Sequence, residues 1–145
     1  MQRIFWLQVL CASAAWPTVV DGQAFDYPFS CIDSSNNFVT AAVAPNGLVV
    51  LVPSTADCVG TVDAVTATFT CVDISSTASG STKFQGAAIA SNGLVIFAPN
   101  NANCVGTFDA ATSAFNCIDI SSTLSGTSKF KTVTTAPNGL VVLIP

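Results

Sequence analysis

The sequence predicts an all-β protein built from short antiparallel strands that are repeated in tandem. The main observation is an internal repeat, because residues 100–145 match residues 54–99 without a gap at 25 of 46 positions. A shorter third copy spans residues 29–53. The composition agrees, since Val, Thr, Ala, Ser and Phe are abundant and helix formers such as Glu, Gln and Met are nearly missing. Such a repeat indicates one small supersecondary unit that is stacked on copies of itself.

The first hairpin of each unit is marked by its turn. In the middle copy, residues 84–90 and 94–98 are the predicted strands, and an Asn-Gly turn joins them. The other copies carry Ala-Pro-Asn-Gly at residues 44–47 and 136–139. Pro presets the first corner of such a turn, and Gly adopts a positive φ without steric cost. The uninterrupted apolar run after each turn predicts a strand that is covered on both faces.

A second hairpin is predicted over residues 58–71, where apolar and polar positions alternate around a four-residue turn. In the register that we expect, Cys58 lies opposite Cys71. The same register sets an aromatic ring, Phe69, across from a glycine, Gly60. The equivalent residues of the later copy are Cys104, Gly106, Phe115 and Cys117.

The motifs NGLVVLVP at residues 46–53 and CVGTFDAATSAFNCIDIS at residues 104–121 represent the two hairpins. Together they resemble the blades of secreted β-propellers, similar to kelch-like, NHL-like and YVTN-type repeats. The resemblance covers residues 29–145 and implies four-stranded antiparallel blades, about two and a half in number. Because propellers close with about four to eight blades, it implies an incomplete or open propeller.

The expected organisation is a secretory signal peptide at residues 1–22, a partial blade at 23–53, and repeats at 54–99 and 100–145. A positive start, followed by an apolar stretch at residues 4–15 that is too short to span a bilayer, indicates the signal. We therefore expect a secreted, extracellular protein without a membrane segment after cleavage. An uncleaved signal anchor is the alternative.

The cysteines are expected to act as structural staples. Cys58 and Cys71 share one face of their hairpin, as do Cys104 and Cys117, so each pair is predicted to form a disulfide. The counterpart of Cys31 would be residue 18, which is a threonine. Cys31 is therefore expected to be unpaired, or paired with another chain. A redox or metal site is the alternative, but the chain has no Cys-x-x-Cys and no His.

The charged residues point away from catalysis and from nucleic acids. The net charge of −4 includes only four basic residues, which cannot hold a phosphate backbone. Without His or Glu, acid–base chemistry has few groups to use, so we expect no catalytic residue, no metal site, no cofactor and no enzyme activity of this chain alone. Calcium binding by loop carboxylates is the alternative to a structural role in turns. The aspartates that recur in the repeats are Asp33, Asp63, Asp73, Asp109 and Asp119.

The function that this pattern favours is an extracellular propeller-like module that binds an unknown protein or glycan, or acts as a scaffold. The alternative is a fragment of a larger secreted propeller enzyme, whose catalytic residues lie outside this chain. The repeats could also assemble from several copies or form a short open array. Open sheet edges would then allow self-association and lead to poor solubility. Lysines at strand edges oppose such pairing, and the repeats contain only Lys83, Lys129 and Lys131.

Overall fold

The computed structural model describes residues 19–20, 23–24 and 37–145, and its regular structure there is entirely β. Two compact units are present, residues 1–35 and 36–145. The first contains a short antiparallel hairpin of β1 (Val19–Val20) and β2 (Gln23–Ala24). Apart from β1, the predicted signal peptide lies outside the described residues, and so does Cys31. No helix in the described part is long and apolar enough to cross a membrane.

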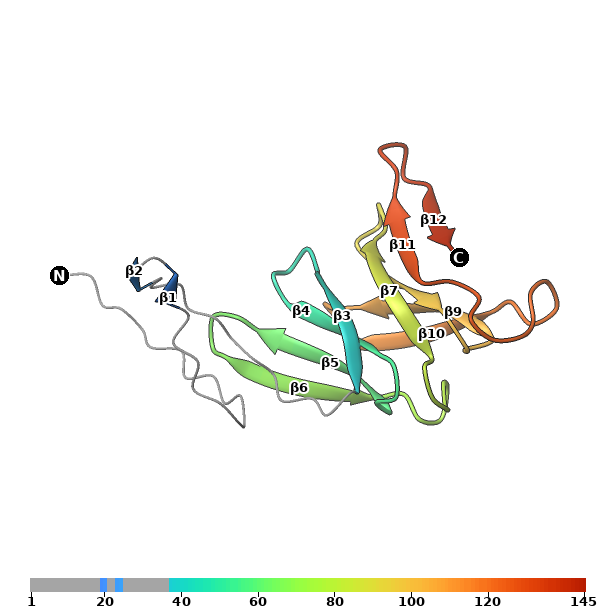
Figure 1. The fold of residues 1–145 in the computed structure, drawn as a ribbon, viewed down its shortest axis with the longest axis horizontal. Helices are drawn as coiled ribbons and strands as arrows, with labels where there is room; N and C mark the ends of the chain where they lie inside the picture. Colours follow the sequence, from blue (N-terminus) through green and yellow to red (C-terminus); the bar gives the residue numbers. More distant parts are fainter. Residues whose placement is uncertain (1–18, 21–22, 25–36) are drawn as a thin grey trace. The chain divides into compact units, whose positions relative to one another are not determined.

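Residues 37–145 form three antiparallel sheets that follow one another along the chain (Figure 1). The first sheet has the order β3 (Phe38–Val43), β4 (Val49–Pro53), β5 (Cys58–Asp63), β6 (Thr68–Asp73). The second repeats it with β7 (Phe84–Ile89), β8 (Val95–Pro99), β9 (Cys104–Asp109), β10 (Ala114–Asp119). The third consists of β11 (Thr132–Thr135) and β12 (Val141–Ile144). The predicted all-β class with four-stranded sheets is confirmed, and the sheets form an open series rather than a closed ring.

The first hairpin of each sheet turns as the sequence predicts. The N–H of Gly47 donates to the carbonyl of Ala44 (2.9 Å), and Gly47 has a φ of 88°. The side chain of Asn46 supports the turn, because its Oδ1 accepts the N–H of Leu48 (3.2 Å). Gly93 and Gly139 repeat the positive φ, at 85° each. The apolar strand that follows is buried on both faces in β4 and β8, as expected from its uninterrupted pattern.

The second hairpin has a register that differs from the prediction by two residues. Cys71 lies opposite Gly60, and Cys58 lies opposite Asp73. The reason is the turn: the expected turn is residues 63–66, but Asp63 belongs to the strand and pairs with Thr68, so the loop consists of residues 64–67. That loop closes because its last residue, Ala67, adopts a φ of 55°. A positive φ is uncommon for alanine, so the sequence does not predict it.

A shift of two residues keeps every side chain on its predicted face, because side chains alternate with a period of two. Cys58 therefore reaches Cys71 diagonally and forms a disulfide across a Cα–Cα distance of 5.5 Å. Cys104 and Cys117 do the same at 5.3 Å. The described residues include no free cysteine.

Aromatic rings cover Gly60 and Gly106 as expected, but Phe69 and Phe115 do not lie directly opposite these glycines. Phe69 lies opposite Val62, yet a Cβ added at Gly60 would meet the Phe69 ring at 3.0 Å. Phe115 lies opposite Phe108 in the second sheet. There, Gly106 is covered mainly by two other rings, Phe97 at 3.0 Å and Phe84 at 3.1 Å.

Successive sheets pack face to face, and we name the faces by direction. The forward face of a sheet lies toward the next sheet along the chain, and the rear face lies toward the previous one. The first interface is apolar: Val50, Val52 and Val59 of the first sheet's forward face join the same buried cluster as Phe84 and Phe97 of the second sheet's rear face. The residues that form the second interface are Ile96, Ala98, Phe130, Val133, Val141 and Leu143. Two equivalent interfaces thus stack three sheets through apolar side chains.

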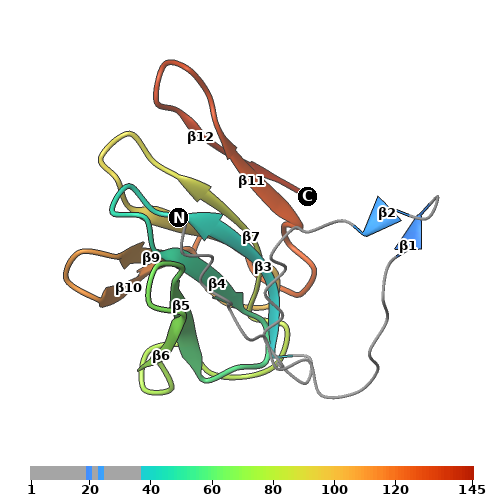
Figure 2. The ribbon, with the colours of Figure 1, turned by 90° about the vertical axis from the view of Figure 1, so that its left-hand side faces the viewer.

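The first strands of the three sheets lie next to one another, β3 beside β7 and β7 beside β11 (Figure 2). The approach is closest at Gly86, where an added Cβ would lie only 2.7 Å from the Cα of Thr132. The hydroxyl of Thr135 in β11 also donates to the carbonyl of Ile89 in β7 (2.8 Å). A glycine at this position therefore allows two backbones to approach more closely than any side chain would permit.

Candidate functional site

A hollow with a polar lining lies between the first and second sheets, and we call it the link hollow. Its volume is about 580 Å³. One wall comes from the segment that links β6 to β7, and the other comes from the start of β9 and the end of β10. The lining residues are Ser76, Thr77, Ala78, Ser79, Ala102, Asn103, Cys104, Cys117 and Asp119.

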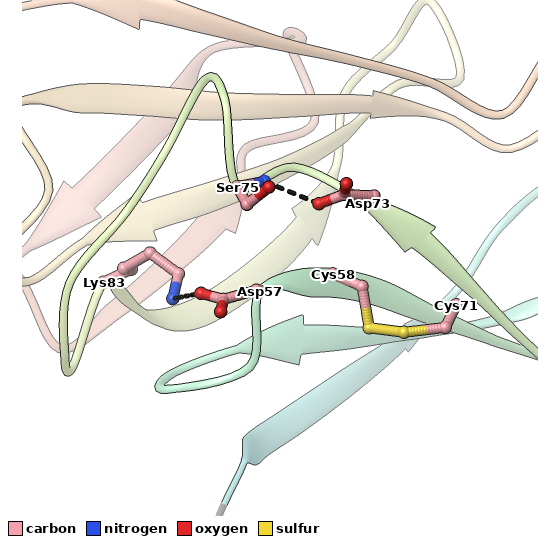
Figure 3. Close-up of a disulfide and its surroundings, with 6 residues drawn as sticks. All are labelled: Asp57, Cys58, Cys71, Asp73, Ser75 and Lys83. Atoms are coloured by element: carbon pink, nitrogen blue, oxygen red, sulfur yellow. Dashed lines mark hydrogen bonds and ion pairs between the residues drawn. A yellow bond between two sulfur atoms is a disulfide. The ribbon is translucent and has the colours of Figure 1, made fainter.

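The link wall is held by a tight turn at its start. Oδ1 of Asp73 accepts the N–H of Ser75 (2.8 Å), as Figure 3 shows for the first sheet. The carbonyl of Ile74 then accepts the N–H groups of Thr77 and Ala78 (2.9 and 2.8 Å). Ile74 and Ala78 are buried in the apolar cluster between the sheets. These anchors leave the intervening hydroxyl side chains, Ser76 and Thr77, exposed at the rim.

The opposite wall is held by the second disulfide. Cys104 lies directly across from Asp119, and its bridge to Cys117 ties the two strands together next to the hollow. The N–H of Ile120 donates to the carbonyl of Asn103 (2.9 Å), which fixes the end of the strand pair. The two cysteines are therefore part of a rigid wall, which suits a preformed binding surface.

Four of the recurring aspartates have the structural role that the sequence predicts. Oδ1 of Asp63 accepts the N–H of Val65 (2.8 Å), and Oδ1 of Asp109 accepts that of Ala111 (2.9 Å). Asp73 and Asp119 bind the N–H groups two residues ahead in the same way. In each case the backbone N–H bond lowers the pKa of the carboxyl below its usual value. These four groups are ionised acceptors at neutral pH, and Asp33 lies outside the described residues.

The described residues contain no group of three or more His, Cys, Asp or Glu side chains that could hold a metal ion. The four aspartates above lie at separate turns, and each accepts the N–H of the residue two positions ahead. What the hollow offers a ligand is instead a set of hydroxyl, amide and carboxylate groups.

Two lysines have a role that the sequence analysis missed. They do not guard strand edges, because Lys83 and Lys129 are both buried at the end of a link. Nζ of Lys83 donates to the carbonyl of Gly80 (2.9 Å) and lies 3.7 Å from Oδ1 of Asp57 (Figure 3). Nζ of Lys129 binds the equivalent carbonyl of Gly126. Each ammonium group closes the loop that precedes it, and the Gly-x-x-Lys spacing shared by both links was the available signal.

Lys83 is expected to make stability depend on alkaline pH. Its side chain is 1% exposed, and burial lowers its pKa, while the charge of Asp57 offsets part of that effect. The unfolded chain then binds more protons than the folded chain in a window that ends near the ordinary lysine pKa of about 10.4, so this group increases stability as pH rises through that window. Urea unfolding of wild type and Lys83→Met at a series of alkaline pH values measures this effect. As pH rises through the window, the unfolding free energy of wild type should increase relative to that of Lys83→Met.

The matched control for this prediction is Lys131→Met, since Lys131 is exposed. We expect that variant to unfold at nearly the wild-type urea concentration at neutral pH. A constant difference between wild type and Lys83→Met across the alkaline range would contradict a lowered pKa at Lys83.

Comparisons with known proteins agree with the geometry. No protein family matches the sequence, and neither does any curated protein. Among solved structures, the fold is similar to selenomethionine-substituted virginiamycin B lyase from Staphylococcus aureus, with a TM-score of 0.64 and 13% sequence identity. The match covers 78% of this chain. The two four-stranded sheets resemble β-propeller blades. At this identity the likeness is one of fold alone.

The chain spans about a third of the length of that lyase, 36% of it. The described blades form part of a propeller arrangement and not a complete ring, as the repeat count predicts. The finer resemblance to kelch-like, NHL-like or YVTN-type blades stays a prediction.

Proposed function

We propose that this chain is an extracellular binding module, and that the link hollow holds a small neutral polar ligand such as a glycan. The observation that carries the proposal is the hollow itself. Its volume of about 580 Å³ is within the range of about 300–1,000 Å³ that is typical of small-molecule pockets. Its polar side chains are three hydroxyls, one amide and one carboxylate, which match the donors and acceptors of a sugar.

The state of the carboxylates favours binding over acid–base catalysis. Asp119 lines the hollow, and its lowered pKa keeps it ionised at neutral pH. A catalytic acid or base would need a pKa closer to the working pH. An ionised carboxylate is instead a strong hydrogen-bond acceptor for a ligand hydroxyl.

The disulfides support the extracellular part of the proposal. Two bridges link adjacent strands in one domain of modest size. Bridges of this kind persist in oxidising compartments and are rare in the cytosol. Secretion also agrees with the predicted signal peptide.

The test is to measure binding of the secreted chain to immobilised neutral oligosaccharides. Ser79→Trp places an indole ring in the link hollow, so we expect it to weaken binding at least about tenfold. Ser125→Trp makes the same change at the equivalent position of the next link, which does not line the hollow, and should leave binding unchanged. Absence of binding to all the oligosaccharides, or equal binding by both variants, would refute the proposal.

A second candidate, part of a larger propeller enzyme, is favoured by the likeness to a lyase of which this chain spans 36%. It is distinguished by the coding sequence downstream of Pro145. Further blades with His, Glu or Tyr in their loops would support the enzyme, whereas further copies of the same repeat would support a binding module.

A further inference from the structure

The forward face of the last hairpin, β11–β12, is exposed although its equivalents are buried. Val142 is 38% exposed and Ile144 is 40% exposed. One repeat earlier, Ile96 and Ala98 occupy the same positions at 8% and 0%. In the first sheet the positions hold Val50 and Val52, both fully buried. The face that buries apolar side chains in two sheets is therefore uncovered in the third.

The covering partner of this face is the same in both existing interfaces. In each case it is the rear face of the following sheet, which has a phenylalanine at or just before the start of its first strand: Phe84 begins β7, and Phe130 lies two residues before β11. The first sheet carries the same rear face. Phe38 is the equivalent phenylalanine, and its ring meets Phe69 edge to face at a centroid distance of 6.2 Å. Phe69 itself is 46% exposed.

We propose that the exposed forward face of β11–β12 binds the rear face of β3–β6 of a second copy of this chain. The contact would continue an interface that the chain already makes twice within itself. The central side chains on both faces are uncharged, so no charge is buried in the contact. The residues concerned are Leu140, Val142 and Ile144 on one copy and the half-buried Phe38 and the exposed Phe69 on the other.

This contact is heterologous, because the two copies use different surfaces. Each copy that binds leaves one forward face and one rear face free at the ends of the assembly. The copies therefore add head to tail, and they form a ring if the rotation closes or a chain if it does not. The inference is independent of the glycan proposal, since the faces do not include the residues that line the link hollow.

Sedimentation velocity of the full secreted chain over a range of concentrations tests the inference. Wild type should form dimers and larger species as concentration rises. Val142→Lys and Phe69→Lys each place an ammonium group in the contact and should weaken self-association at least about 100-fold. Val65→Lys is the control, because Val65 is 94% exposed in the β5–β6 turn and belongs to neither face.

Mixing the two variants separates this interface from other kinds of association. Val142→Lys keeps an intact rear face and Phe69→Lys keeps an intact forward face, so the mixture should form heterodimers that grow no further. Circular dichroism and intact disulfides verify that each variant is folded. A wild-type chain that stays monomeric at all concentrations, an effect of Val65→Lys equal to that of Val142→Lys, or a mixture without heterodimers would overturn the inference.

Discussion

Replacing Phe84 by alanine is expected to lower the free energy of unfolding by about 3–5 kcal/mol. Phe84 is fully buried between the first two sheets. Its ring packs against Phe97 and Phe115 at centroid distances of 5.6 and 6.2 Å, and it covers the backbone at Gly106. Alanine would leave a cavity bounded by these rings and by a glycine that has no side chain to fill it. Urea unfolding at low protein concentration measures the loss.

The repeat supplies the control for this prediction. Phe38 occupies the equivalent position of the first sheet, but it is only half-buried, and among the described residues its ring contacts one other ring, that of Phe69. Phe38→Ala should therefore cost clearly less than Phe84→Ala, although the chemical change is identical. Equal losses would mean that burial between the sheets adds nothing at this position.

Removing the second disulfide should also lower stability substantially, by about 3 kcal/mol or more. The bridge between Cys104 and Cys117 closes a loop across 13 positions, and the chain-entropy model gives about 3 kcal/mol for such a loop. Cys104 is in addition buried in the apolar cluster between the sheets. The double variant Cys104→Ala/Cys117→Ala loses both contributions, and guanidinium unfolding measures their sum.

The first disulfide is the matched comparison, because it spans the same number of positions. Cys58 is buried as Cys104 is, at 8% exposed, but Cys71 is exposed whereas Cys117 packs against the cluster between the sheets. Cys58→Ala/Cys71→Ala therefore loses the same loop constraint and less packing. We expect the loss at the second bridge to exceed the loss at the first. The reverse order would show that the sulfur atoms of Cys104 and Cys117 contribute little to packing between the sheets.

The fold could be predicted from the sequence to the level of strands and sheets, because the repeat fixes where each element recurs. The Asn-Gly turns predict the first hairpins, since glycine at a positive φ is a strong local signal. The register of the second hairpin could not be predicted, because Ala67 and Ser113 adopt φ values of 55° and 58° without being glycine. The sequence predicts only which side chains share a face of the hairpin. This is enough to place the two cysteines of each pair on one face, where they form a disulfide.

The link hollow could not be predicted, because its two walls come from different sheets. Residues 76–79 and residues 102–103 each look like loop sequence, and nothing local indicates that they face each other. Their proximity follows from how the sheets stack, which depends on apolar side chains elsewhere. The two buried lysines could have been predicted, since a lysine that recurs three residues after a glycine and immediately before a phenylalanine is unusual for a solvated charge.

The burial of Lys83 and Lys129 also affects how readily proteases can cleave the chain. Enzymes that cleave after basic residues need an extended, accessible segment, and of the three lysines in the described part only Lys131 is exposed. Lys83 and Lys129 hold their own links closed through the same side chains that a protease would have to bind. The link between β6 and β7, whose lysine is Lys83, is thus protected from such enzymes for as long as the blades stay folded, whereas the link between β10 and β11 still offers them the exposed Lys131.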